Sequence, residues 1–325
     1  MSGRAWAAFA AVSLLWGVPY LFIKIAVDGD AHPMLIAWGR VLIGAAILLP
    51  IAWRIGALRG LRSRLRPLAL FAACEMALPW WLIPVGEQHL SSSVTAILIA
   101  SVPLMIAAIA LRFDPGERVR GIRLAGLFVG LAGVVLLVGV DIAGRPGELF
   151  GAGAILLATL GYAIGPMIVK HRFAGFNPLG PVAAAFAISS VMLAPAALAT
   201  LPSADPTAGA LASIAVLGVA CSALGMFLFV ALITEAGPSR ASVITYINPA
   251  VAVALGVTLL DESLAPAAVA GLLLILAGSW LSTDGRAPPG AAAAVTRLRR
   301  RGQRPRVAEG EIVGLGAPSP QRSRG

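Results

Sequence analysis

Two charged side chains, Arg40 and Glu75, stand inside apolar stretches of this sequence. Ionisable groups in such stretches are costly, usually face an interior cavity, and are functional candidates by default. At 1.5 Å of rise per residue, we place them about 10 and 12 Å from opposite ends of their helices, bracketing the middle of a core about 30 Å thick. A cation and an anion this close suit a zwitterion, with Arg40 binding a carboxylate as a planar fork and Glu75 an ammonium. A structural ion pair and a proton-binding role are the alternatives.

Polar and aromatic residues form a stripe along one face of the first apolar segment. They recur every three or four residues, which is the helical period, and a similar stripe occurs at 159–170. Bulky aromatic rings prevent close helix packing through hydroxyl groups, so we favour a cavity wall for Trp16, Tyr20 and Tyr162. The lysine that ends each stripe is expected to extend to the lipid headgroups. The stripes are Ser13, Trp16, Tyr20 and Lys24, and Thr159, Tyr162, Pro166 and Lys170.

Two further apolar segments are interrupted by a proline that has polar residues beside it. Tyr246 and Asn248 precede Pro249, and Ser101 precedes Pro103. Proline leaves a helix carbonyl without its usual N–H partner, and a membrane protein tolerates such breaks where they are buried or line a cavity. We therefore count Ser101, Tyr246 and Asn248 among the candidate substrate-binding residues. The alternative is a plain kink in which Asn248 caps the backbone of a neighbouring helix.

Tryptophans are the other large side chains in the apolar segments. Trp80 and Trp81 lie near the end of their predicted span. Tryptophan is enriched where membrane helices meet the headgroups. We therefore expect these two residues, together with Trp38, Trp53 and Trp280, to form an interface belt rather than a binding site.

The composition indicates a membrane protein. Of 325 residues, 58% are hydrophobic and 12% are charged, which is about half the charged fraction of a soluble domain. Runs of about 20 apolar residues recur, the length that a helix needs to cross a bilayer. We predict an all-α membrane protein with ten transmembrane helices. The predicted spans are about 5–27, 33–53, 67–86, 92–112, 121–140, 147–169, 178–200, 208–233, 238–260 and 265–283.

The charges in the loops predict how these helices are oriented. Of the 25 Lys and Arg residues, 22 fall on one side of the predicted membrane. Basic loops remain in the cytoplasm, so we expect a multi-pass protein of the inner (plasma) membrane with both termini cytoplasmic. Residues 284–325 hold nine Arg and three acidic residues, or +6 of the net charge of +10. We interpret them as a disordered basic cytoplasmic tail, and the charge distribution argues against a nucleic-acid partner.

Residues 93–137 and 239–282 share one spaced pattern. Each copy contains Ser, Pro, Glu and two Gly seven residues apart, and the copies are offset by 145 or 146 residues. Cys74 and Cys221 extend the match at an offset of 147. Similarity at a fixed offset indicates an internal repeat, and five helices per copy would make the copies face opposite ways across the membrane. The matched residues are Ser93, Pro103, Glu117, Gly126 and Gly133, and Ser239, Pro249, Glu262, Gly271 and Gly278.

These residues resemble the drug/metabolite transporter superfamily, specifically its EamA-type ten-helix branch. The resemblance covers about residues 5–283 and rests on the repeated Pro, Glu and Gly pattern, the aromatic-plus-lysine pattern of the first helix, and Arg40. It implies two inverted five-helix EamA-like repeats, here 1–140 and 141–283, around a central cavity. It also implies transport, often export, of small metabolites such as amino acids. The second repeat departs from the pattern, because Ala185 stands at the position that matches Arg40.

We therefore predict a secondary transporter, in the export direction by resemblance, that moves an amino acid or a related zwitterion by alternating access between the repeats. The sequence has no Walker-type phosphate loop with which to use ATP, and protons are a candidate coupling ion. We predict no cofactor, no metal and no catalytic residue. The expected partners are the metabolite and the bilayer, with a homodimer as an option.

The alternative hypothesis is a membrane enzyme or flippase that acts on a lipid-linked headgroup. Asp28 and Asp30 stand close together in a predicted loop, and paired carboxylates can hold a divalent metal. The loops are too short to form a substrate domain, however. The three histidines, His32, His89 and His171, all fall in or near loops, which also argues against an enzyme.

Overall fold

The computed structural model describes residues 2–113, 121–142, 144–200, 206–237, 241 and 243–282, and these residues form helices joined by short turns. Of the elements, η1 is a 3-10 helix, and η2, η4 and η5 are π-helical. The elements in chain order are α1 (Gly3–Gly17), α2 (Pro19–Asp28), α3 (Pro33–Arg54), η1 (Leu61–Arg64), α4 (Leu65–Ala72), η2 (Ala73–Ala77), α5 (Leu78–Glu87), α6 (Ser92–Ile99), α7 (Val102–Phe113), α8 (Ile122–Leu136), η4 (Leu137–Ile142), α9 (Pro146–Arg172), α10 (Leu179–Ala199), α11 (Ala208–Val216), η5 (Leu217–Leu224), α12 (Gly225–Ala236), α14 (Ile244–Leu259) and α15 (Pro266–Ser282).

Eight helical stretches among the described residues are long and apolar enough to cross a membrane. They occupy the positions of the first eight predicted spans, and the shorter apolar helices α14 and α15 occupy the positions of the last two. The predicted all-α membrane class is confirmed. Glu117, Ser239 and the predicted tail at 284–325 lie outside the described residues.

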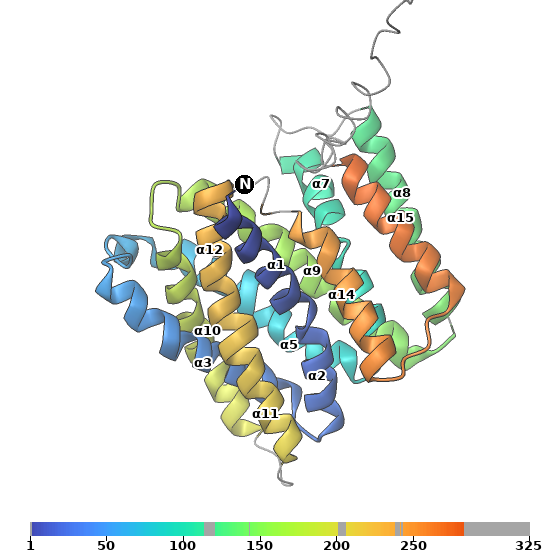
Figure 1. Ribbon diagram of the computed structural model, residues 1–325, viewed down its shortest axis with the longest axis horizontal. Helices are drawn as coiled ribbons and strands as arrows, with labels where there is room; N and C mark the ends of the chain where they lie inside the picture. Colours follow the sequence, from blue (N-terminus) through green and yellow to red (C-terminus); the bar gives the residue numbers. More distant parts are fainter. Residues whose placement is uncertain are drawn as a thin grey trace, which may run out of the picture. The chain divides into compact units, whose positions relative to one another are not determined.

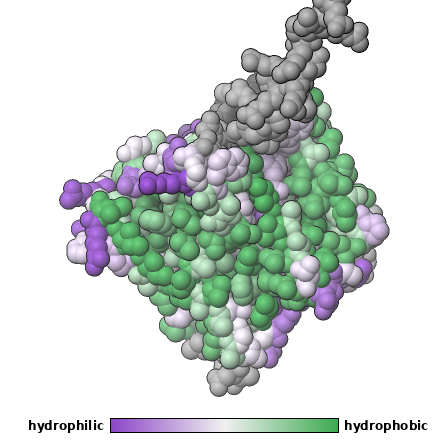
Figure 2. Space-filling view, in the orientation of Figure 1, coloured by the Kyte–Doolittle hydropathy of each residue, from purple (hydrophilic) through white to green (hydrophobic). Residues whose placement is uncertain are grey.

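Apolar side chains cover much of the outside of the helices. Figure 2 shows one face on which they form a broad continuous surface, with hydrophilic residues gathered toward its edges. The exposed side chains include Phe128, Val191 and Leu273. A soluble protein rarely exposes so large an apolar surface, whereas a bilayer matches it.

Close contact between helices α8 and α15 depends on glycine. The two helices run side by side (Figure 1). A Cβ atom on Gly133 would come within 2.8 Å of the carbonyl oxygen of Gly271, and one on Gly126 within 2.9 Å of that of Gly278. Small residues allow membrane helices to approach this closely. The two glycine pairs found in the sequence repeat therefore meet each other in the structure.

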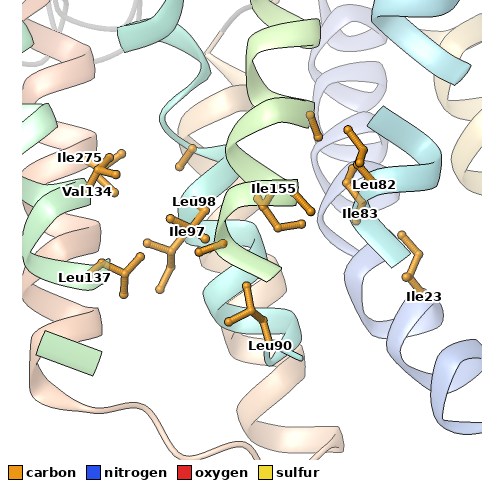
Figure 3. Close-up of a cluster of buried hydrophobic side chains, with 14 of the residues drawn as sticks. Ile23, Leu82, Ile83, Leu90, Ile97, Leu98, Val134, Leu137, Ile155 and Ile275 are labelled. Carbon is orange, nitrogen blue, oxygen red and sulfur yellow. The ribbon is translucent and has the colours of Figure 1, made fainter. Parts of the chain in front are cut away.

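A cluster of buried aliphatic side chains joins helices from both halves of the chain (Figure 3). Ile97 and Leu98 of α6 lie in it together with Ile155 of α9 and Ile275 of α15. A second cluster, which includes Phe186 of α10, joins α10 to α3, α4 and α5. Arg40, Glu75 and Tyr162 are carried by helices that these two clusters hold in place, whereas Trp16 of α1 packs against a third cluster that includes Phe9 and Leu232.

Two π-helical segments lie in the third and eighth spans, at positions that the sequence repeat matches. Segment η2 contains Cys74 and Glu75, and segment η5 contains Cys221 and Ser222. Helix α10 packs on η2, and helix α3 packs on η5. Such π-helical turns are rare and often occur at functional sites. Glu75 and Ser222 are thus both presented by locally widened helices.

Candidate functional site

Arg40 of α3 is buried in the interior of the helical assembly. Its Nε and Nη2 atoms both lie 3.4 Å from the Oγ atom of Ser222. Its guanidinium carbon stands 4.0 Å from the centre of the Trp80 ring, which makes a cation–π contact. Trp80 in turn packs edge-on against Phe186, with 5.4 Å between ring centroids. Arg40 is therefore held by an aromatic face and a hydroxyl group.

Glu75 of η2 points toward α9 instead of Arg40. A Cβ atom on Gly165 would collide with its Oε2 atom, so glycine at this position makes room for the carboxyl group. Oε2 is buried and accepts no hydrogen bond from the part of the chain that the structure describes. The ion pairs formed by the described residues do not include one between Arg40 and Glu75. The structural ion pair considered from the sequence is thus wrong, because the two side chains turn to different neighbours.

Two tyrosines lie among these charges. Tyr162 of α9 lies within electrostatic range of both Arg40 and Glu75. Tyr20 of α2 lies within the same range of Arg40, Tyr162 and Glu87. Both rings are half-buried. The structure therefore brings four predicted site residues, Tyr20, Arg40, Glu75 and Tyr162, into one polar interior region. The cavity wall predicted for the aromatic residues stays a prediction.

Trp16 borders the same region from α1. Its Nε1 atom donates a hydrogen bond of 3.2 Å to the carbonyl oxygen of Cys221. Its ring lies 4.6 Å from that of Phe229 of α12, measured between centroids. Cys221 is the neighbour of Ser222, so Trp16 and Arg40 both contact the π-helical segment η5.

Ser101 and Asn248 are engaged with helix backbone. The Oγ atom of Ser101 donates a hydrogen bond of 2.6 Å to the carbonyl of Leu98, in the break between α6 and α7. The amide nitrogen of Asn248, turned to face two carbonyl oxygens, lies 3.2 Å from that of Ser13 and 3.1 Å from that of Ile244. These contacts match the alternative in which the residues support kinked helices. Tyr246 is half-buried in α14.

The interface belt predicted for the tryptophans is wrong for Trp80. Only 4% of this side chain is exposed, and it lies under Arg40. Trp38 is half-buried and donates a hydrogen bond of 3.1 Å to the carbonyl of Ser190. Trp53 and Trp280 are exposed, as a belt requires. The position of Trp80 near a helix end gave no indication of which neighbouring helix it faces, and Ser222 was missed altogether.

Comparison with known proteins identifies the family of this chain. The EamA-like transporter family matches residues 2–139 and, separately, residues 149–283. The chain belongs to this family. It is therefore a membrane transporter, as the sequence resemblance predicted.

Relatives of this EamA-like transporter carry names that agree with the assignment. It is 29% identical over 267 residues to "Uncharacterized inner membrane transporter YedA" of Escherichia coli, covering 79% of this chain and 83% of the relative. An "Uncharacterized transporter" of Archaeoglobus fulgidus is 25% identical over 284 residues, covering 86% of this chain and 98% of the relative. A solved crystal structure of a protein with 20% identity shares the fold, with a TM-score of 0.62 over 87% of this chain and 98% of that one.

Asp28, one of the two carboxylates considered for an enzyme, has a partner on its own helix in this EamA-like chain. Asp28 forms an ion pair with Lys24, with 2.8 Å between Oδ1 and Nζ. Among the described residues, no group of three or more His, Cys, Asp or Glu side chains is placed to hold a metal ion. The family assignment points to a transporter rather than an enzyme.

A groove of about 750 Å³ opens between α4, α7 and α9 of the EamA-like fold. Its floor is mainly apolar, with Leu70, Ile109 and Ile164 among the residues that line it, and Arg66 and Arg172 are basic residues in its lining. None of the eight predicted substrate-binding residues lines this groove. The charged interior around Arg40 is therefore separate from it.

Proposed function

We propose that this chain is a secondary transporter for a small zwitterion, with an amino acid as the simplest substrate. The observation that supports this proposal is that the buried Arg40 has no carboxylate partner among the described residues. Its guanidinium is buried, yet no described carboxylate forms an ion pair with it, and its hydrogen-bond distances to Ser222 are long at 3.4 Å. Ionisable side chains inside membrane proteins usually pair with an opposite charge or mark a substrate pathway. A substrate carboxylate, bound as a two-pronged fork, would supply the missing partner.

The second charge of the zwitterion is assigned to Glu75. Because Glu75 does not contact Arg40, its carboxyl group is not neutralised by that arginine. Tyr162 lies within electrostatic range of both residues, so the three groups share one region of the interior. An amino acid with its carboxylate at Arg40 and its ammonium toward Glu75 would lie against Tyr162, whose ring face favours a cation.

We also propose that the chain crosses the membrane ten times, as two inverted repeats at 1–140 and 141–283 with both termini in the cytoplasm. Two observations support this arrangement. The family matches the chain twice, and α3 packs on η5 while α10 packs on η2, which relates the second helix of each repeat to the third helix of the other. Inverted repeats allow alternating access, because exchanging the conformations of the two halves exchanges the open side. We assign export on the family resemblance.

The proposal is tested with purified protein in proteoliposomes and a panel of labelled amino acids. We expect Arg40→Ala and Glu75→Gln each to remain folded and to lose most of the flux, since neither removes the partner of a formed ion pair. Arg40→Lys keeps the charge but not the planar fork, so it should restore only part of the flux. The exposed Arg54, substituted to Ala, is the matched control and should leave the flux unchanged.

Thermal stability is measured for the same variants. If Arg40 and Glu75 formed a structural pair in the working protein, each single variant would lose stability and Arg40→Ala/Glu75→Ala would recover it. A double variant that regained both stability and full flux would rule out zwitterion binding at these residues. Full flux in Arg40→Ala alone would also contradict the proposal.

A further inference from the structure

Glu87, the last residue of α5, is a buried acid that the proposed substrate site does not use. The predicted spans 67–86 and 92–112 leave it in the loop between them. In the structure its exposed fraction is 0%. Neither carboxyl oxygen accepts a hydrogen bond from the described residues. A buried acid without a donor is unusual and needs a physical explanation.

Lys24 lies near Glu87 but does not donate a hydrogen bond to this carboxyl group. Lys24 of α2 donates instead to the backbone carbonyl of Glu87, at 3.3 Å, and to Oδ1 of Asp28, at 2.8 Å. Lys24 was predicted to extend to the headgroups, and its amine reaches the exposed Asp28 at the end of α2. The groups that act electrostatically on the Glu87 carboxyl are Lys24, Asp28 and Tyr20 of α2, Arg40 of α3, and Glu262 of the segment before α15.

The remaining neighbours of this end of α5 offer little compensation. On the α9 side, Gly86 packs against Gly151 and Ile155. On the α6 side, the backbone N–H groups of Ser92 and Ser93 are already bound to Glu262. An ionised carboxylate here would lose its hydration without gaining hydrogen bonds, and Asp28 and Glu262 would repel it. A neutral carboxylic acid avoids both costs.

We propose that Glu87 is a proton-binding site, that its carboxyl group carries a proton in this conformation, and that the exchange of this proton with water couples transport to proton movement. The protonated state follows from the burial of Glu87 and from the lack of hydrogen-bond donors to its oxygens among the described residues. The coupling rests on the transport function proposed above. When this end of the helices opens to water, the proton leaves as hydronium and a carboxylate remains. The new negative charge faces Glu262, and the repulsion favours release of Glu262 from α6. Protonation reverses the sequence.

Infrared spectroscopy of purified protein in lipid nanodiscs tests the protonation without any substrate. A protonated carboxyl group has its own carbonyl-stretch band. We expect that band in the unmodified protein at neutral pH, a reduced band in Glu87→Gln, and an unreduced band in the control Glu148→Gln, because Glu148 is partly exposed and paired with Arg145. Glu75→Gln, run in parallel, separates the contribution of the other buried acid.

An unmodified protein without the band, or a band that Glu87→Gln leaves unchanged, would overturn the proposal. Should Glu87→Gln fail to fold, Glu87→Asp retains a carboxyl group in a new position. A shifted band in Glu87→Asp supports the assignment, and an unshifted one contradicts it.

Transport in proteoliposomes tests the coupling. In the unmodified protein, we expect a pH gradient to increase amino-acid flux several-fold. Glu87→Gln should bind the substrate and exchange it at equilibrium, and its flux should be the same with and without the gradient. A Glu87→Gln variant that still responds to the gradient would disprove the coupling. If no amino acid is transported by any variant, the substrate proposal fails while the infrared result still decides the protonation of Glu87.

Discussion

The carboxylate of Glu262 binds the N-terminus of α6 at Ser93. Its Oε2 atom accepts hydrogen bonds from the backbone nitrogen and the hydroxyl of Ser93, at 3.0 and 2.5 Å. Its Oε1 atom accepts one from the backbone nitrogen of Ser92, at 2.7 Å. A carboxylate at this place satisfies N–H groups that a helix leaves free and complements the helix dipole. Ser93 and Glu262 belong to different copies of the sequence pattern, so the contact joins the two predicted repeats.

Replacing Glu262 by alanine should destabilise the protein. The substitution leaves two backbone N–H groups and one hydroxyl group without their charged acceptor, and hydrogen bonds to charged groups contribute about 1.5–3 kcal/mol each. We expect a lower melting temperature for Glu262→Ala and an intermediate one for Glu262→Gln. Glu148→Ala removes a carboxylate from a partly exposed pair and is the control. Equal melting temperatures for Glu262→Ala and Glu148→Ala would show that the contact contributes nothing.

Trp80 should matter for both stability and flux. Trp80→Leu removes the aromatic face under Arg40, a contact of about 0.5–2 kcal/mol, and the edge contact with Phe186. We expect a lower melting temperature and a reduced amino-acid flux, with Trp80→Phe closer to the unmodified protein. Trp53→Leu, at an exposed position, should change neither quantity. The experiment compares thermal unfolding and uptake for the three variants. A Trp80→Leu variant that behaves like Trp53→Leu would contradict the predicted role of Trp80.

Alanine at Gly278 should separate α8 from α15. The added Cβ atom would lie 2.6 Å from the carbonyl oxygen of Gly126 and would also strike the backbone of Gly130. Backbone atoms cannot rotate away, so we expect a loss of about 1–3 kcal/mol despite the better helix propensity of alanine. Gly139→Ala is the matched control, because its Cβ would meet nothing within 4 Å. Denaturant or thermal unfolding of both variants gives the comparison.

Orientation can be measured with single cysteines in a Cys74→Ala/Cys221→Ala background. Ser63, in η1, and Gln88, after α5, are both exposed and are predicted to face opposite sides of the membrane. The loop charges predict that an impermeant thiol reagent added to intact cells labels Gln88→Cys and spares Ser63→Cys. Labelling of Ser63→Cys from outside would reverse the proposed orientation.

The position of each charge along its own helix could be predicted from the sequence. The neighbouring helix that each charge faces could not. Arg40 and Glu75 were placed inside the membrane because long apolar runs surround them. Their depth does not determine their rotation about the helix axis, so Glu75 was not expected to face Gly165. One signal was available for Ser222: the match of Cys74 with Cys221 also aligns Glu75 with Ser222. Glu87 was misplaced because it follows an apolar run, where a loop and a buried helix end look alike.

The bond between Glu262 and α6 also has a consequence for biosynthesis. Ser92 and the carboxylate that binds it are separated by 170 residues. Helix α6 is therefore synthesised long before Glu262, the acceptor for its terminal N–H groups, exists. During that interval the helix end must be satisfied by water or by lipid headgroups. Completion of this end of the transporter thus belongs to the last stage of synthesis, when the segment leading into α15 reaches the membrane.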